Sequence, residues 1–268
     1  MSTPVPIPIV LSISGHDPGG GAGIQADIES ITANGCHACS VITCLTEQDT
    51  CDVCRMSPQP PSQVLAQART LMADSQIAAV KIGLLGEAGI ARALGQLLEE
   101  HPGIPVVLDP VLASGAGTDL TGQALERTIR EWLLPRAALA TPNSLEARAL
   151  VPDCTSLDDC GAQWLGLGCA AVLITGTHES GPQVINRLYR RDHPPVDSAW
   201  PRLPESYHGS GCTLASAIAA RLARGEELTV ATRKAQEYTW QTLYHGLRTG
   251  RCQPIPNRLF GLGRGVPS

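Results

Sequence analysis

The sequence predicts a single α/β domain in which a mainly parallel central sheet lies between two layers of helices. Two observations predict this fold class. Short apolar runs rich in β-branched residues alternate with amphipathic helical patterns along most of the chain, and such alternation favours parallel strands covered by helices on both faces. No linker, internal repeat or low-complexity tract interrupts the 268 residues. We therefore expect one domain over residues 1–268.

Each element is expected from its own periodicity. The first helical pattern places Ile24, Ile28 and Ile31 on one face, and the second has Pro61 in its first turn, where proline is favoured. The expected strands cover residues 7–14, 38–45, 77–82, 104–108, 137–140 and 169–175. The expected helices cover residues 23–34, 61–74, 87–100, 122–134, 157–167, 212–223 and 229–247. The stretches 46–60 and 182–208 break the pattern and are expected to form hairpins or lids.

Composition excludes several classes of function. The chain has a net charge of −5, and only two of its 20 Lys and Arg residues are Lys, so a basic nucleic-acid surface is not expected. No apolar run reaches the roughly 20 residues that a membrane span needs. The first residues lack the cationic and apolar segments of a secretory signal. We therefore expect a cytoplasmic protein that binds neither nucleic acid nor membranes.

The ten cysteines have two open interpretations. In a chain of this length without an export signal, cysteines are typically buried thiols that act as small hydrophobes, rather than a disulfide framework. Alternatively, Cys36, Cys39, Cys51 and Cys54 form two Cys-x-x-Cys pairs that resemble a four-thiolate zinc site. The eleven residues between the pairs are fewer than is usual for that site. They also contain an apolar run that, as a strand, would hold the pairs apart.

A first glycine-rich loop follows the first expected strand. Gly21-x-Gly23-x-x-Ala26 fits the dinucleotide-binding fingerprint, and Glu47 stands about 20 residues further on, as that fingerprint requires. However, Gly21 trails the strand, whereas the fingerprint places its first glycine in the turn directly after it. An NAD-dependent oxidoreductase therefore remains an alternative, and a loop over another small ligand is favoured. No Walker-type phosphate loop is present.

A second glycine-rich loop precedes the helix expected at 212–223. Backbone N–H groups of Gly209, Ser210 and Gly211 can converge at such a helix start, where the helix dipole also favours an anion. The same position lowers the pKa of a cysteine thiol. We therefore expect an anion site here, with Cys212 beside it as an accessible thiolate.

Taken together, these segments resemble the hydroxymethylpyrimidine/phosphomethylpyrimidine kinases of thiamine biosynthesis, which belong to the ribokinase-like superfamily. The most specific matches are Asp-Pro-Gly-Gly-Gly-Ala-Gly-Ile-Gln-Ala-Asp at 17–27 and Gly-Cys-Thr at 211–213. Further matches, in family order, stand at 40–43, 48–50, 81–83, 109–111 and 141–146. The resemblance covers most of the chain.

The resemblance implies a ribokinase-like three-layer α/β/α fold and an ATP- and Mg²⁺-dependent kinase. Its expected reaction phosphorylates the hydroxymethyl group of 4-amino-5-hydroxymethyl-2-methylpyrimidine, and then phosphorylates the monophosphate to the pyrophosphate. The expected partners are this small pyrimidine, ATP and a second copy of the chain in a homodimer. Pyridoxal or pyridoxine kinase activity is the alternative within the same superfamily, because that substrate is also a flat ring with a hydroxymethyl group.

The resemblance also implies roles for individual residues at the pyrimidine. Gln48 stands at the family's substrate position, and its amide can both donate to and accept from an aminopyrimidine edge. Asp27 and the backbone of Gly15 are expected to complete that edge. Val111 and Leu84 are expected to be the apolar walls of the ring site.

A second group of residues is expected at the phosphates. Asn143 and Glu146 match the superfamily's Asn-x-x-Glu element, which holds Mg²⁺, and Asp109 is expected beside the same phosphates as nucleotide and metal ligand. Thr175 and His178 are expected to contact the nucleotide. Cys212 occupies the position of the superfamily's catalytic base, with Gly209, Ser210 and Gly211 supplying backbone donors to the transferred phosphoryl group.

The chain departs from the family pattern at two lysines. The family usually has Val-Ala-Lys-Ser-Gly after Asp-Pro-Val, whereas this chain has Leu-Ala-Ser-Gly-Ala-Gly at 112–117. Thr175 stands where the family often has the second lysine. We expect His178 or an arginine from 187–191 to replace the lost charge.

Overall fold

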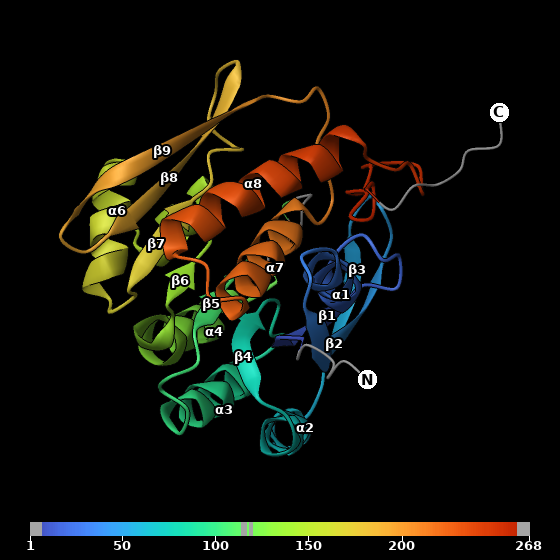
Figure 1. Ribbon diagram of the computed structural model, residues 1–268, viewed down its shortest axis with the longest axis vertical. Coiled ribbons are helices and arrows are strands. Elements are labelled where there is room, and N and C mark those ends of the chain that lie inside the picture. The colour runs from blue at the N-terminus through green and yellow to red at the C-terminus, as the bar shows by residue number, and fades with distance from the viewer. Residues whose placement is uncertain (1–6, 114–116, 118–119, 262–268) are drawn as a thin grey trace, which may run out of the picture.

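The computed structural model describes residues 7–113, 117 and 120–261, and they form the elements labelled in Figure 1. The strands are β1 (Ile9–His16), β2 (His37–Gln48), β3 (Val53–Pro58), β4 (Ile77–Ile82), β5 (Val106–Leu108), β6 (Leu139–Ala140), β7 (Ala171–Ile174), β8 (Gln183–Arg190) and β9 (His193–Pro201). The α-helices are α1 (Gly23–Ala33), α2 (Pro61–Asp74), α3 (Ala88–Glu99), α4 (Gly122–Thr128), α5 (Ser144–Leu150), α6 (Leu157–Gly166), α7 (Ser210–Ala223) and α8 (Leu228–Tyr244).

All nine strands belong to one sheet, in the order β3-β2-β1-β4-β5-β6-β7-β8-β9. The six strands from β2 to β7 in this order run parallel to one another. Antiparallel pairs occur only at the edges, where β3 pairs with β2 and the β8–β9 hairpin extends from β7. The mainly parallel sheet is therefore confirmed, and hairpins form in both stretches where the sequence pattern breaks.

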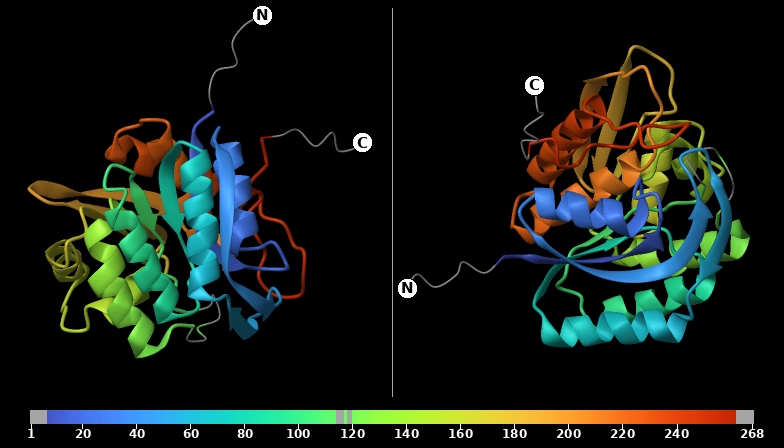
Figure 2. Two further views of the ribbon diagram at one scale, coloured as in Figure 1. Left: turned by 90° about the horizontal axis from the view of Figure 1, so that it is seen from below. Right: turned by 90° about the vertical axis from the view of Figure 1, so that its right-hand side faces the viewer.

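Helices cover both faces of the sheet. In Figure 2 (right), α1, α7 and α8 lie on one side of β1 and β2, and α2 and α3 lie on the other. Alternation along β4 shows how one strand serves both layers: Val80 and Ile82 join the core under α2 and α3, whereas Ala79 packs with α7. The residue between Val80 and Ile82 therefore faces the α1–α7 layer, because side chains alternate along a strand.

Most expected elements form within a few residues of their predicted bounds, and two regions differ in kind. The single helix expected at 122–134 is shorter as an α-helix, because α4 is followed by a π-helical turn (Ile129–Leu133) and a 3₁₀ turn (Leu134–Arg136). Helix α5 was not expected. It begins with a capping box, in which Asn143 and Glu146 each bond the backbone of the other. Helix α7 begins at Ser210, two residues earlier than expected.

The cysteines only partly follow the expectation of buried thiols. Cys36, Cys44 and Cys169 are buried and free, but Cys51–Cys252 and Cys154–Cys160 are disulfides and Cys54 is exposed. The zinc site is not assembled: Cys51 is bonded to Cys252, and the length of β2 separates the two Cys-x-x-Cys pairs.

The topology determines where a ligand site can form. The chain leaves β1 to one side to form β2 and later returns to its other side as β4, and ligands bind beyond the carboxyl ends of parallel strands at such a switch point. The loops after β1, β4, β5, β6 and β7 all meet at that edge. In the described part of the chain, no helix is long and apolar enough to cross a membrane.

Candidate active site

A cavity of about 740 Å³ lies at the carboxyl ends of the parallel strands. Its lining combines the loops after β1, β4, β5, β6 and β7 with the start of α7 and the β8–β9 hairpin. The site residues expected from the sequence that line it are Gly15, Gln48, Leu84, Asp109, Val111, Asn143, Glu146, Thr175, His178, Gly209, Ser210, Gly211 and Cys212. The topology thus brings together all of the expected site residues except Asp27.

Asp27 lies beneath the cavity rather than at its surface. Its side chain is fully buried on α1. Its Oδ2 accepts hydrogen bonds from Ser12 Oγ at 2.6 Å and Lys81 Nζ at 3.0 Å, and its Oδ1 accepts one from Ser216 Oγ at 2.7 Å. Both carboxylate oxygens therefore already have protein partners. The expectation that Asp27 contacts the pyrimidine edge is corrected: Asp27 belongs to a buried charge cluster made of Ser12, Asp27, Lys81 and Ser216.

Lys81 is the functional residue that the sequence reasoning missed. It is fully buried between Val80 and Ile82 of β4, and strand alternation points it toward Asp27 in the α1–α7 layer. Its Nζ also lies 4.0 Å from Asp109 Oδ2. Burial alone would lower the pKa of Lys81, but the negative charges of Asp27 and Asp109 hold that pKa above its usual value. A signal was present, since a lysine in an otherwise apolar strand needs a buried partner.

Two carboxylates face the cavity beside this cluster, and we call them the acidic pair. Asp109 follows β5, and Glu146 stands in the first turn of α5. Burial, opposed by Lys81, raises the pKa of Asp109 to about 6. Burial and the charge of Asp109 raise the pKa of Glu146 to about 8. The raised pKa values mean that the charged form of each carboxylate is disfavoured here. A cation bound in the cavity would stabilise that charged form.

The acidic pair fits a magnesium ion. Asp109 Oδ2 is buried without a hydrogen-bond partner among the described residues, and Mg²⁺ favours one or two carboxylates together with water and phosphate oxygens. Asn143 lines the cavity as expected and has a second role at the start of α5. Its Oδ1 accepts hydrogen bonds from the N–H groups of Leu145 and Glu146, both at 2.9 Å, so it caps α5 and positions Glu146.

The start of α7 has the geometry expected of an anion site. Gly209 is the N-cap residue with φ of 86°, and a Cβ atom there would meet the carbonyl oxygen of Gly21 at 1.8 Å. Only glycine fits this position. The N–H groups of Ser210, Gly211 and Cys212 belong to the first turn, where intrahelical partners are lacking and the helix dipole favours negative charge.

Cys212 does not have the acidity that its position suggested. Burial raises the pKa of its thiol to about 12, and the nearby ammonium of Lys81 offsets only part of this effect. The negative charges of Asp109 and Asp27 raise that pKa further. The expectation of an accessible thiolate is therefore corrected, because removal from water outweighs the helix N-terminus here.

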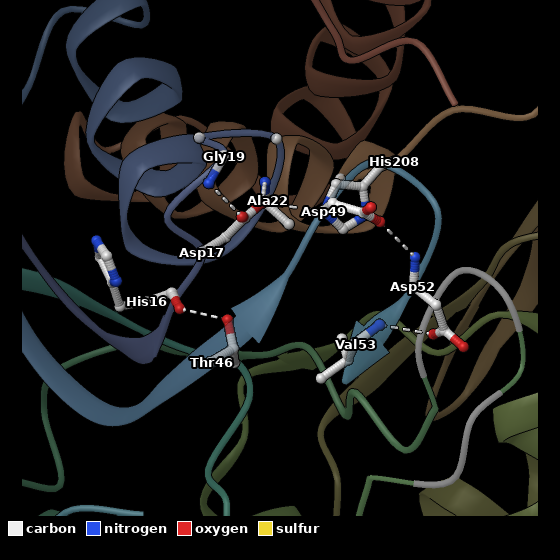
Figure 3. A network of polar contacts seen from close by, with 12 residues as sticks. His16, Asp17, Gly19, Ala22, Thr46, Asp49, Asp52, Val53 and His208 are labelled. Carbon is white, nitrogen blue, oxygen red and sulfur yellow. Dashed lines mark hydrogen bonds and ion pairs between the residues drawn. The ribbon is translucent and has the colours of Figure 1, made fainter. Parts of the chain in front are cut away.

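The first glycine-rich loop is organised by Asp17 (Figure 3). Its carboxylate accepts hydrogen bonds from the N–H groups of Gly19 and Ala22, both at 2.8 Å, and lies 2.9 Å from His208 Nε2. The loop therefore connects directly to the second glycine-rich loop. Six residues separate β1 from α1, unlike the tight turn of a dinucleotide-binding fold.

Arg258, from the C-terminal segment, holds the two glycine-rich loops together. It is buried and donates to the carbonyl oxygens of Gly20 and Gly21, to Thr213 Oγ1 at 2.9 Å and to Glu29. Nothing in the local sequence marks this residue, because its partners lie more than 40 residues away along the chain. The contact fixes the start of α7 against the loop after β1.

Gln48 reaches the cavity from the β2–β3 hairpin. It ends β2 opposite Val53, just after a register shift in the pairing. Next to it, the Cys51–Cys252 disulfide ties the hairpin to a C-terminal segment whose Gln253 also lines the cavity. The hairpin that carries Gln48 is thus held beside the cavity by its strand pairing and by this disulfide.

Of the replacements expected for the missing lysines, His178 reaches the cavity and the arginines of 187–191 do not. Arg187 does not line the cavity and pairs instead with Asp158 and Asp197. Arg190 and Arg191 are also absent from the lining. His178 and Arg202 do line it. In the loop at 112–117, whose sequence differs from the family pattern, residues 114–116 lie outside the described residues.

The fold and this cavity define a ribokinase-like α/β protein. The chain superposes on an ADP complex of Bacillus subtilis pyridoxal kinase with a TM-score of 0.88 at 24% identity, covering 96% of this chain and 100% of that one. At this identity the likeness shows a shared fold. It confirms the three-layer architecture expected from the sequence.

The chain belongs to the phosphomethylpyrimidine kinase family, whose model matches residues 17–256. It is 40% identical to the hydroxymethylpyrimidine/phosphomethylpyrimidine kinase of Salmonella typhimurium, over 78% of this chain and 81% of that one. It is 38% identical to the Streptomyces coelicolor protein of the same name, over 92% and 93%. The phosphomethylpyrimidine kinase structure from Clostridium difficile is 31% identical with a TM-score of 0.75, covering 86% of this chain and 97% of that one.

Proposed function

We propose that this protein is an ATP-dependent kinase of thiamine biosynthesis. It phosphorylates 4-amino-5-hydroxymethyl-2-methylpyrimidine and then its monophosphate. One observation carries this proposal: a single cavity contains the amide of Gln48, the acidic pair and the first turn of α7. A ring, a metal-bound polyphosphate and a transferred phosphoryl group each find matching chemistry there. Membership of the phosphomethylpyrimidine kinase family supports the same assignment.

The pyrimidine is expected at the β2–β3 side of the cavity. Gln48 can donate to and accept from the aminopyrimidine edge, while Val111 and Leu84 supply apolar contact. Gly15 allows Cys44 and Leu84 to pack closely against the backbone at this end of the cavity, since a Cβ there would come within 3.0 Å of both side chains. This placement points the hydroxymethyl group toward Cys212 and the start of α7.

Phosphoryl transfer depends mainly on positioning and on neutralising charge. Asp109 and Glu146 would hold Mg²⁺, which neutralises charge on the phosphate oxygens and orients them. The N–H groups of Ser210, Gly211 and Cys212 would bind the transferred phosphoryl group. Because the Cys212 thiol stays protonated, we assign it contact with the hydroxymethyl group rather than removal of its proton. A loose transition state needs little activation of the nucleophile.

Two further features follow from the resemblance to the family. We propose that the protein works in the cytoplasm and that it forms a homodimer. Light scattering coupled to size-exclusion chromatography tests the dimer. A monomer at micromolar concentration would contradict it.

A coupled assay of ADP release tests the proposed function. Three acceptors are compared under identical conditions: the pyrimidine alcohol, its monophosphate and pyridoxal. We expect the highest kcat/KM with the pyrimidine alcohol, measurable turnover of the monophosphate and weaker turnover of pyridoxal. Preference for pyridoxal would instead favour the alternative kinase, and no turnover of any acceptor would contradict the proposal.

A further inference from the structure

The cavity is poor in positive charge for a site that takes polyphosphate. Both lysines typical of the family are missing, and Lys81 lies beneath the surface, bound to Asp27. Among the described lining residues, Arg202 is the one lysine or arginine side chain. Four carboxylates line the same cavity, from Asp17, Asp109, Glu146 and Glu205. Phosphates therefore need a cation here beyond any bound metal.

Arg202 directly follows β9 and holds the loop after β7. Its Nε donates to the carbonyl oxygen of Gly181 at 2.8 Å, its Nη1 to that of Thr177 at 2.8 Å, and its Nη2 to that of Glu179 at 2.6 Å. A weaker bond runs from Nη2 to Gln183 at 3.5 Å. These bonds engage four of the five N–H groups of the guanidinium. One N–H on Nη1 remains for a ligand.

The charge of Arg202 is not neutralised by a carboxylate in the described part of the chain. Other arginines at this end of the sheet are paired: Arg187 with Asp197, and Arg148 with Glu179. Arg202 meets only backbone carbonyl groups. A half-buried guanidinium that faces a cavity without an acidic partner is suited to an anionic ligand, because arginine binds phosphate through its planar fork.

The loop that Arg202 holds belongs to the phosphate side of the cavity. Thr175 and His178 line the cavity, and Thr175 forms a parallel bridge with Asn143, the cap of α5. The ion pair between Arg148 of α5 and Glu179 ties the loop to α5 a second time. Arg202 is therefore fixed relative to the helix that carries Glu146.

We infer that Arg202 replaces the missing family lysines by binding the nucleotide phosphates through its free Nη1 N–H while it holds the loop at 176–182 in place. This inference rests on the proposed function, because it assumes that a nucleoside polyphosphate occupies the cavity. It assigns the role to a residue other than the two expected alternatives, His178 and an arginine from 187–191. Arg202, which directly follows β9, thus supplies the positive charge that the missing lysine after β7 would have supplied.

The test compares ligands with and without phosphates. Inhibition constants of ADP and adenosine, against ATP, are measured for the parent, Arg202→Gln, Arg202→Lys and the control Arg187→Gln, which removes an arginine of the same hairpin outside the cavity. We expect Arg202→Gln to weaken ADP about tenfold, because a hydrogen bond to a charged group is lost. Adenosine should bind as in the parent. Arg202→Lys should recover part of the loss, and Arg187→Gln should match the parent.

Two outcomes would overturn the inference about Arg202, and a third would contradict the proposed function. Equal weakening of ADP and adenosine in Arg202→Gln, with no recovery in Arg202→Lys, would show that the residue only shapes the loop and would overturn the inference. Unchanged ADP binding in Arg202→Gln would also overturn it. In both cases the proposed function would stand, because the parent binds ADP. A parent protein that binds no ADP and turns over no pyrimidine would contradict the proposed function itself.

Discussion

Two groups of polar and charged side chains lie within a few ångströms of each other, and they differ in whether their carboxylates have protein partners. In the buried charge cluster, Asp27 is bonded to Ser12, Lys81 and Ser216, and none of these side chains faces the cavity. In the acidic pair, Asp109 Oδ2 has no hydrogen-bond partner among the described residues, and Glu146 has a pKa raised to about 8 by burial and by Asp109. The buried charge cluster therefore stabilises the fold, whereas the acidic pair is available to bind a ligand.

The largest expected effect is on stability, in the buried charge cluster. Lys81→Met leaves Asp27 as an unpaired buried carboxylate, which typically costs about 3–5 kcal/mol. The free energy of unfolding, from urea titration, measures this. The chain's only other lysine, Lys234, provides the control. It is partly exposed and pairs with Glu226, which keeps Arg221 as a second partner, so Lys234→Met should cost less than about 1 kcal/mol.

A double variant sharpens this test. Adding Asp27→Asn to Lys81→Met removes the unpaired charge, so the double variant should be more stable than Lys81→Met alone. If Lys81→Met and Lys234→Met lose the same stability, the cluster does not support the fold.

The next largest effect is on substrate binding at Gln48, and the free energy of unfolding should stay unchanged. Gln48→Ala removes the amide that we propose contacts the pyrimidine, and a lost hydrogen-bonding partner costs about 1–3 kcal/mol, or roughly a 5- to 150-fold rise in KM for the pyrimidine. KM for ATP should stay near the parent value. The neighbour Glu47, paired with Arg55 on the exposed hairpin surface, gives the control Glu47→Ala. Parent-like pyrimidine kinetics in Gln48→Ala would remove Gln48 from the site.

Within the acidic pair, Glu146→Gln should change metal dependence without changing stability. Glutamine can still accept from the N–H of Asn143, so the capping box survives. The Mg²⁺ concentration for half-maximal rate should rise about tenfold, while the free energy of unfolding stays within about 0.5 kcal/mol of the parent. A Mg²⁺ curve that overlays the parent's would make Glu146 only a helix residue.

The smallest effect is confined to acidic pH. Burial alone would raise the pKa of Asp17, but hydrogen bonds from His208 and from the N–H groups of Ala22 and Gly19 hold that pKa below its usual value. Its contribution to stability is therefore present above the unfolded pKa of 3.8 and is lost as pH falls through the lower folded pKa. Asp17→Asn should unfold with a shallower dependence on pH below about 4. Identical slopes in both proteins would refute this.

Local patterns predicted most of the fold and most of the site. Residues that follow parallel strands meet at one edge of the sheet whatever lies between them, so Gly15, Asp109 and Thr175 could be placed together from the sequence alone. The helix α5 was not predicted because seven residues are too few to show a helical periodicity. Its capping box, Asn143 with Glu146 three residues later, was the usable signal.

The remaining features depend on contacts between distant segments. Asp27 was expected at the cavity because nothing in the sequence of its helix shows that Lys81, 54 residues away, donates a hydrogen bond to its carboxylate. Cys51 and Cys252 are 201 residues apart, and spacing does not identify such a pair. The thiol of Cys212 was expected to be acidic because the helix start is visible in the sequence, whereas the burial that opposes it is not.

The burial of Lys81 has a practical consequence for chemical labelling. The chain has two lysines, and one of them is fully enclosed between β4 and α1. An amine-reactive dye would therefore modify the side chain of Lys234 and spare that of Lys81 in the folded protein. Lys234 lies on α8, does not line the cavity and is 40% exposed, so a fluorophore attached there would leave the site open to its ligands.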